Sequence, residues 1–248
     1  MTRRIAMWSG PRNISTAMMR AWENRPDTDV IDEPFYAYYL AQTQAEHPVK
    51  EDVLAAQPNH WSDVVSQLLA PKPEHIFYQK HMTHHMLDDI ELDWCKSLSH
   101  CFLIRDPLYV VTSYLKKMPS VNLEDIGIVR QFKLYQHLSV LTGQQIPIID
   151  GDDVLQNPKA ILSSLCAKLE LPFSNNMLSW PQGRRESDGV WAQHWYQNVE
   201  SSTGFKAPAR AESKQQLLAH LTSQQQDVVQ ISQVFYQQMY QQRLHVDE

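Results

Sequence analysis

Short runs of apolar residues alternate along the chain with segments whose apolar residues recur at helical spacing. The apolar runs predict five strands, at 4–8, 28–31, 75–79, 100–104 and 146–149. Helical spacing predicts helices at 15–23, 123–141 and 158–169, and a proline-interrupted series of helices over 35–70. Such alternation is typical of a parallel sheet covered by helices. We therefore expect an α/β fold of three layers, in which a central, mostly parallel sheet is flanked by helices.

The last third of the chain departs from this pattern. Residues 180–210 contain many aromatic side chains with little periodicity, so we expect an ordered loop. The glutamine-rich tail keeps apolar residues at helical spacing, among them Leu221, Val228 and Phe235, and predicts an amphipathic helix. This helix is expected to be structural or to form a homodimer face. No repeat or linker is evident, and we expect residues 1–248 to form one domain.

Composition narrows the classes of partner. The 248 residues carry a formal charge of −6, which argues against non-specific binding of nucleic acid. The three cysteines follow no metal-ligand spacing, and neither a signal peptide nor a membrane span is evident. We expect a cytoplasmic protein with no membrane partner, whose anion sites are built from a few arginine and lysine residues.

The segment IAMWSGPRNISTAMMRAW predicts a strand, a tight loop and the start of a helix. Free backbone N–H groups and the helix dipole favour a bound anion at such a start. The residues expected to bind it are Gly10, Pro11, Arg12, Asn13, Ile14, Ser15 and Thr16. A Walker A loop is excluded because its second glycine and its lysine are missing. The loop alone is equally consistent with a plain turn in which Ser15 caps the helix.

A second anion site is predicted in HCFLIRDPLYVVTSYL. Arg105 ends a strand at the sheet edge where open α/β sheets bind ligands, and Ser113 follows in the next helix, which begins after Asp106 and Pro107. Arg105 and Ser113 could hold one phosphate. The alternative is that Arg105 pairs with Asp106 or another carboxylate at the strand end.

Four segments together resemble the PAPS-dependent sulfotransferases, in particular a branch found in bacteria and plants. SGPRNIST is similar to their 5′-phosphosulfate loop, RDPLYVVTS to their 3′-phosphate motif, IIDGDDVLQNPKAILSSLCAKLELPF to the segment after a late strand, and GRRESDGVW to their C-terminal motif. The resemblance implies a P-loop nucleotide-binding-like fold. It also implies transfer of a sulfuryl group from PAPS to a hydroxyl or amine of a small-molecule acceptor, with Arg184 and Arg185 reaching the 3′-phosphate.

Two residues of the first loop depart from the family pattern. Arg12 stands where the family usually has lysine, which keeps the charge. Ile14 stands where the family has glycine, and a β-branched residue tolerates a positive φ poorly. We expect a slightly different loop shape at this position.

Sulfuryl transfer needs a base for the acceptor and cations for the leaving phosphate. Glu33, just past the second strand at the carboxyl edge of the sheet, is the first candidate for the base, and the resemblance implies the same role, which a glutamate in the corresponding place has in some bacterial relatives. The alternative is that Asp32, Glu33 and Pro34 simply begin a helix, where acidic residues suit the dipole. His81 is the competitor, since QKHMTHHML is similar to a segment that holds the catalytic histidine of cytosolic sulfotransferases. Lys80 is expected to contact the bridging or leaving oxygens. Because a sulfuryl group carries less charge than a phosphoryl group, we expect no metal.

Two other functions stay open at this point. The same fold could belong to a nucleotide-binding regulatory or interaction protein that transfers no sulfuryl group. A metal-dependent phosphohydrolase would instead use His84, His85 and Asp88, with His84 and Asp88 on one helix face.

Overall fold

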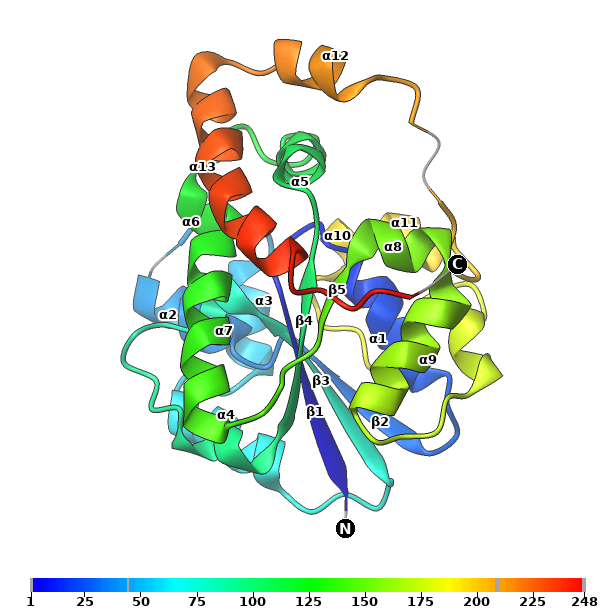
Figure 1. Cartoon of the computed structure of the whole chain (residues 1–248). Coiled ribbons are helices and arrows are strands. Elements are labelled where there is room, and N and C mark those ends of the chain that lie inside the picture. The colour runs from blue at the N-terminus through cyan, green and yellow to red at the C-terminus, as the bar shows by residue number, and fades with distance from the viewer. Residues whose placement is uncertain (1, 44, 208–209, 247–248) are drawn as a thin grey trace.

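A sheet of five parallel strands forms the centre of the protein, in the order β2-β3-β1-β4-β5 (Figure 1). The structure is a computed structural model that describes residues 2–43, 45–207 and 210–246. The strands are β1 (Arg3–Ser9), β2 (Thr28–Asp32), β3 (Ile76–Met82), β4 (Ser99–Ile104) and β5 (Ile148–Asp150). The predicted fold class is confirmed, and each predicted strand is found; β3 extends three residues beyond its expected end.

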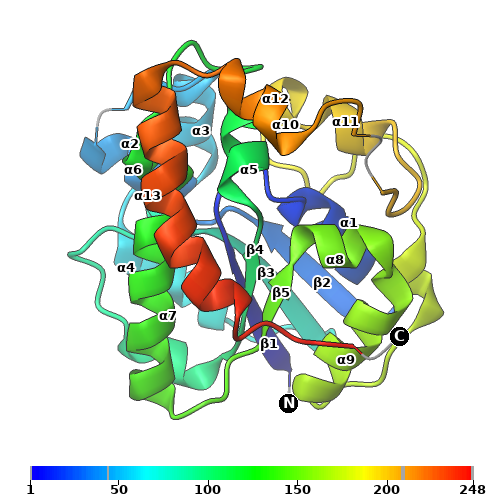
Figure 2. The same ribbon diagram turned by 45° about the horizontal axis from the view of Figure 1, so that its top comes forward.

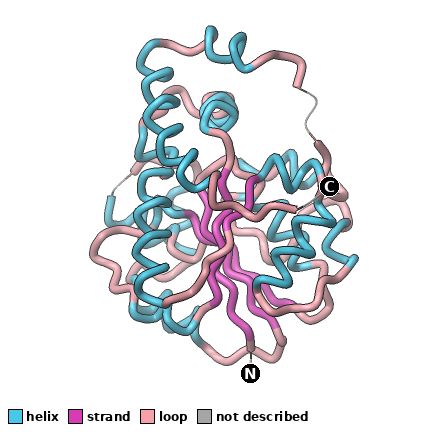
Figure 3. The backbone as a smooth tube through the Cα atoms, in the orientation of Figure 1, coloured by secondary structure: helices cyan, strands magenta, loops and turns pink. Residues whose placement is uncertain are grey.

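Helices cover both faces of the sheet (Figures 1 and 3). They are α1 (Ser15–Glu23), α2 (Tyr36–Thr43), α3 (Lys50–Ala56), α4 (Trp61–Leu69), α5 (Pro107–Tyr114), α6 (Leu123–Ile126), α7 (Ile128–Thr142), α8 (Gly151–Gln156), α9 (Pro158–Lys168), α10 (Ala192–Trp195), α11 (Gln197–Glu200), α12 (Lys214–Ala219) and α13 (Ser223–Tyr240), with 3₁₀ turns η1 (Thr83–His85), η2 (Asp93–Ser97) and η3 (Asn175–Leu178). In the described part of the chain, no helix combines the length and apolar character needed to cross a membrane.

The central strand β1 shows how the two cores are built. Successive side chains of a strand point to opposite faces, so Ile5 and Met7 pack with α1 and α9. Ala6 and Trp8 pack on the opposite face, against α7 and α13. All four are fully buried, which explains why β1 has a continuous apolar run and no polar alternation.

Three predicted elements are subdivided in the structure. The helix expected at 123–141 is broken at Gly127, whose φ of 69° is left-handed, so α6 ends and α7 begins there. The expected loop at 180–210 contains the short helices α10 and α11, and its positions 208 and 209 lie outside the described residues. The tail forms α12 and α13, because Thr222 caps a new helix through the backbone N–H of Gln225.

The carboxyl ends of all five strands meet at one edge of the sheet, at the top of Figure 1. Helix α5 leaves this edge as predicted, with Pro107 at its first position and the Asp106 carboxylate accepting a hydrogen bond of 2.9 Å from Leu108 N. Figure 2 shows α1, α5 and α8 leaving the same edge. The loops that precede these helices are therefore neighbours, although they are far apart in sequence.

Candidate active site

The loop between β1 and α1 packs closely against α6. A Cβ atom on Gly10 would lie 2.8 Å from the carbonyl oxygen of Ile126, a distance at which something must shift. Glycine is therefore required here by close backbone approach. Gly10 sets the path of the loop and does not itself line the cavity described below.

Two non-glycine residues of this loop have left-handed backbone conformations. Arg12 has a φ of 55° and Ile14 a φ of 51°. This conformation costs an L-residue about 1–2 kcal/mol, and such strain clusters at functional sites. Ile14 therefore adopts the left-handed backbone conformation that favours glycine, although its Cβ is branched. Glu33, with a φ of 41°, shares this conformation.

Helix α1 begins at Ser15 without a side-chain cap. Ile14 occupies the N-cap position and makes no side-chain hydrogen bond, so the interpretation in which Ser15 caps the helix is wrong. The first backbone N–H groups of a helix have no partner within it, and with the helix dipole they favour an anion. Asn13 holds the loop in place by donating from Nδ2 to the carbonyl oxygen of Leu103 at 2.6 Å.

The two predicted anion sites are joined by hydrogen bonds. Nε of Arg12 donates to Oγ of Ser113 at 3.0 Å, and Nη1 of Arg105 donates to the carbonyl oxygen of Arg12 at 2.9 Å. Nε of Arg105 also lies 3.7 Å from a carboxylate oxygen of Asp152, which is too long for a hydrogen bond. The expected carboxylate partner at the strand end therefore exists, but it holds Arg105 only loosely; Asp106 pairs with Lys214 instead.

These groups line one cavity, with a volume of about 390 Å³. Of the predicted site residues, it is lined by Pro11, Arg12, Asn13, Ile14, Ser15, Thr16, Glu33, Lys80, Arg105 and Ser113. Burial lowers the pKa of Arg12, and the like charge of Arg105 lowers it further. An anion bound between the two guanidinium groups would offset this repulsion.

A buried polar cluster surrounds Lys80 beside this cavity. Nζ of Lys80 donates to Oδ1 of Asp32 at 2.7 Å, to Oε1 of Glu33 at 2.5 Å and to Oη of Tyr196 at 2.8 Å. Tyr196 in turn donates to Oδ2 of Asp32 at 2.6 Å. Three donor bonds satisfy the ammonium group completely, so Lys80 is held in one position.

Charge and burial act in opposite directions within this cluster. Burial raises the pKa of Glu33, and the nearby Lys80 ammonium offsets that rise only in part. For Lys80, burial disfavours the charged form, but the carboxylates of Asp32 and Glu33 raise its pKa well above the ordinary value. Glu33 is thus a carboxyl group at a cavity wall whose proton affinity is increased, a property suited to a general base.

His81 does not reach the cavity. Lys80 and His81 are adjacent residues within β3, not after it, and therefore point to opposite faces of the sheet. The His81 ring is stacked on Trp8 with centroids 4.3 Å apart, its Nε2 lies 3.2 Å from Oε1 of Gln79, and burial lowers its pKa to about 3. His81 is a neutral core residue, and its candidacy as the base is not supported.

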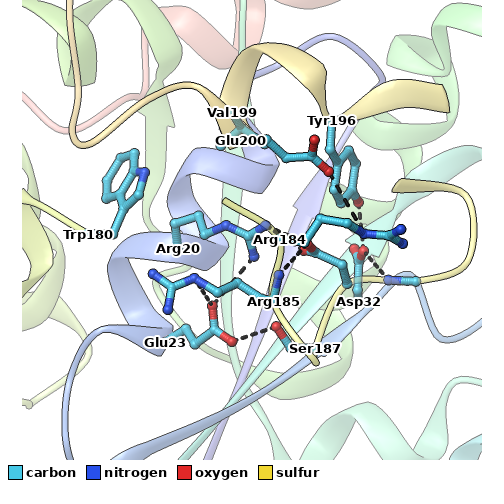
Figure 4. Close-up of polar contacts among 12 residues, drawn as sticks. Arg20, Glu23, Asp32, Trp180, Arg184, Arg185, Ser187, Tyr196, Val199 and Glu200 are labelled. Atoms are coloured by element: carbon cyan, nitrogen blue, oxygen red, sulfur yellow. Dashed lines mark hydrogen bonds and ion pairs between the residues drawn. The ribbon is translucent and has the colours of Figure 1, made fainter. Parts of the chain in front are cut away.

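Arg184 and Arg185 are not among the residues that line the cavity. Figure 4 shows their polar contacts: Arg184 approaches Glu200 at 4.0 Å and is 56% exposed, whereas Arg185 lies 3.9 Å from Glu23. The loop that carries them is tied to α1, because Nη2 of Arg20 contacts both carboxylate oxygens of Asp188, at 2.6 and 2.7 Å. The expectation that these two arginines reach the 3′-phosphate is not supported by this arrangement.

The metal-site hypothesis finds no support among the described residues. They contain no group of three or more His, Cys, Asp or Glu side chains placed to hold a metal ion. The turn η1 ends at His85, so His84 and Asp88 do not share a helix face, and Asp88 is 95% exposed and paired with Arg130.

Of the aromatic side chains in 180–210, Trp195 lines the cavity. Tyr36, Tyr114 and Asp125, which were not singled out in the sequence, also line it, and Asp32 and Tyr196 complete the cluster around Lys80. For Asp32 a signal existed, since it ends a strand at the ligand-binding edge beside Glu33. No local pattern marks Tyr196, which approaches Lys80 from 116 residues further along the chain.

The chain belongs to the sulfotransferase domain family, whose model matches residues 3–242. Two solved sulfotransferase domains share its fold. One comes from the olefin synthase of Synechococcus PCC 7002, with a TM-score of 0.53, 16% identity and coverage of 94% of both chains. The other comes from the curacin biosynthetic pathway, with a TM-score of 0.51, 17% identity and coverage of 88% of this chain and 97% of that one.

Two curated relatives from Arabidopsis thaliana are branched-chain-amino-acid aminotransferase-like proteins 1 and 2. Each is 34% identical over 207 residues, which make up 83% of this chain but only 37% of the relative. The chain thus spans little more than a third of the length of these relatives.

Proposed function

We propose that the protein is a PAPS-dependent sulfotransferase that acts on a hydroxyl or amine of a small-molecule acceptor. One observation carries this proposal: Arg12, Arg105 and Ser113 are joined by hydrogen bonds beside the N-terminus of α1 and line the same cavity. Two cationic groups and an uncapped helix start in one cavity suit a ligand with two separate anionic groups, as PAPS has.

Different residues of this chain are assigned to the donor phosphates and to the acceptor. PAPS supplies the activated sulfuryl group on its 5′-phosphate. Arg12 and the start of α1 stabilise negative charge on the departing phosphate and the sulfuryl oxygens. Lys80, whose three N–H groups donate to Asp32, Glu33 and Tyr196, holds Glu33 in position instead of contacting these oxygens. Arg105 and Ser113 hold the 3′-phosphate.

Glu33 is proposed as the base. Its carboxylate takes the proton from the acceptor while the acceptor oxygen or nitrogen bonds to sulfur. The bond between sulfur and the phosphate oxygen breaks, and its electron pair leaves with adenosine 3′,5′-bisphosphate. Glu33 lines the cavity beside Lys80, and burial raises its pKa toward the range in which a carboxylate accepts a proton effectively.

A thermal-shift comparison of adenosine 3′,5′-bisphosphate, ATP and GTP tests the donor class. Preferential stabilisation by the bisphosphate is expected, because only ligands that bind the native state raise the melting temperature. Transfer of label from radiolabelled PAPS to an acceptor then tests the activity. Equal shifts with all three nucleotides would contradict the donor assignment, and binding without transfer would indicate a nucleotide-binding protein. A homodimer and a cytoplasmic location stay predictions.

A further inference from the structure

One wall of the cavity is rich in aromatic rings. Tyr36, Tyr114, His84, His85 and Trp195 all line it. The rings of Tyr36 and His85 are stacked with centroids 4.6 Å apart and planes 11° from parallel. This wall is built by α2, η1, the end of α5 and α10, whereas the anion loop belongs to α1. It is therefore suited to the acceptor and not to the phosphates.

The imidazoles of this wall contribute no positive charge. Burial lowers the pKa of His84 to about 3 and that of His85 well below its ordinary value. The pKa of His47, whose Nδ1 lies 2.8 Å from Oη of Tyr36, is also lowered by burial. These rings are neutral near pH 7, so the wall offers no countercharge to an anionic acceptor.

Asp125 is the charged group of the wall. One of its carboxylate oxygens accepts a hydrogen bond of 2.9 Å from the backbone N–H of Asn122, within the capping box of α6. Among the described residues no side-chain cation pairs with it, and burial followed by the neighbouring Glu124 charge raises its pKa, with only the Asn122 bond acting against them. A half-buried carboxylate without a cation is unfavourable, and a cationic ligand would offset this cost.

The rings next to Asp125 complete an environment for an ammonium group. Asp125 lines the same cavity as Tyr114, Tyr36 and Glu33. Burial, followed by the charge of Asp125, raises the pKa of Tyr114. Tyr36 and Tyr114 thus share this cavity with both the proposed base and Asp125. A carboxylate beside aromatic faces attracts organic cations through charge and cation–π interactions.

We propose that the acceptor is a hydroxyl compound that carries a protonated amine, with the ammonium group held by Asp125 and Tyr114 and the hydroxyl directed to Glu33. This inference rests on the proposed function for the transfer step, because the amine stays protonated and only the hydroxyl is sulfated. Acceptors that carry a carboxylate are disfavoured, since they would meet Asp125 with like charge.

Three para-substituted phenols test the proposal, because they share the phenol group and differ in the charge of the side chain. They are tyramine, which is cationic, 4-ethylphenol, which is neutral, and 3-(4-hydroxyphenyl)propionate, which is anionic. We expect kcat/KM for tyramine to exceed that for 4-ethylphenol by about tenfold or more, the worth of one hydrogen bond to a charged group, and the propionate to be the poorest. Asp125→Asn keeps an acceptor for the capping box and should reduce the ratio of tyramine to 4-ethylphenol by about tenfold. Glu124→Gln removes the same charge from the exposed neighbouring residue and should leave the ratio unchanged.

Binding separates this proposal from the proposed function. Calorimetry of tyramine and of 4-ethylphenol, each with the wild-type protein loaded with adenosine 3′,5′-bisphosphate, measures acceptor affinity without transfer. Tighter binding of tyramine than of 4-ethylphenol, lost in Asp125→Asn, supports the cation site even if no acceptor is sulfated. Absence of sulfation would contradict only the proposed transferase activity. Equal affinities for the two probes, or preference for the propionate, would overturn the cation site while leaving sulfotransfer intact.

Discussion

Nε of Arg12 donates a hydrogen bond of 3.0 Å to Oγ of Ser113, a residue 101 positions further along the chain. The bond joins the loop after β1 to the helix after β4, because both leave the same edge of the sheet from adjacent parallel strands. The two segments that predicted separate anion sites in the sequence therefore line the same cavity in the structure.

Arg105→Ala is expected to weaken binding of adenosine 3′,5′-bisphosphate by about 100-fold, since charge-assisted hydrogen bonds to a phosphate are lost. Isothermal calorimetry measures the effect. Arg3→Ala, which removes a surface arginine paired with Glu170, serves as the control. An affinity within twofold of the wild type in the Arg105 variant would remove this residue from the site.

Glu33→Gln should lower kcat by about 10²–10⁴-fold, the usual contribution of a general base. The affinity for the bisphosphate should change little, because Glu33 is assigned to the acceptor and not to the donor. Steady-state kinetics and calorimetry on the same protein separate these effects. Loss of donor binding together with activity would point to a structural role for Glu33.

The pH profile gives a second test of Glu33. A base acts when deprotonated, so kcat/KM should rise as the pH increases through its pKa. Because burial raises that pKa above 4.5, the ordinary glutamate value, the rise should be centred above pH 4.5, and it should vanish in Glu33→Gln. A profile with the same acidic limb in both proteins would assign the titration to another group.

His81→Phe should retain activity within about threefold, because a phenyl ring can keep the stacking on Trp8 and the side chain does not face the cavity. A stability loss of about 1 kcal/mol is expected, since Gln79 loses its side-chain partner. Urea unfolding and kinetics measure the two effects. A fall in kcat comparable to that of Glu33→Gln, in a folded variant, would restore His81 as the base.

Asp188→Asn should destabilise the protein by about 3 kcal/mol. The side chains of Arg20 and Asp188 are both fully buried, and replacing the carboxylate leaves the buried Arg20 guanidinium with its longer contact of 3.5 Å to Glu23 in place of this close pair. Glu170→Gln breaks the exposed pair with Arg3 and should cost less than about 1 kcal/mol. Equal losses of unfolding free energy in the two variants, measured by urea unfolding, would show that the buried pair stabilises the protein no more than the exposed pair.

The fold and part of the site could be predicted because they follow local rules. Apolar runs identify the five strands, and Arg105 and Glu33 directly follow strands, which places them at the ligand-binding edge of a parallel sheet. The break at Gly127 was missed because the apolar pattern continues through it, although the glycine adopts a left-handed φ.

Assignments that depend on side-chain direction or on distant partners could not be made in this way. Whether Lys80 or His81 faces the cavity depends on the register of β3, since one step along a strand reverses the side chain. Arg184 and Arg185 looked suited to a phosphate, but their loop is fixed by the buried pair between Arg20 and Asp188.

Local sequence is enough to predict the strand–helix alternation, the loop after β1 and the residues at the strand ends, because these depend on neighbours within a few positions. The folded chain is needed to show that Arg12 contacts Ser113, that Tyr196 contacts Lys80, and that Asp125 lies on the wall of the same cavity. Such contacts join segments far apart in the chain, and only packing of the helices on the sheet brings their side chains together.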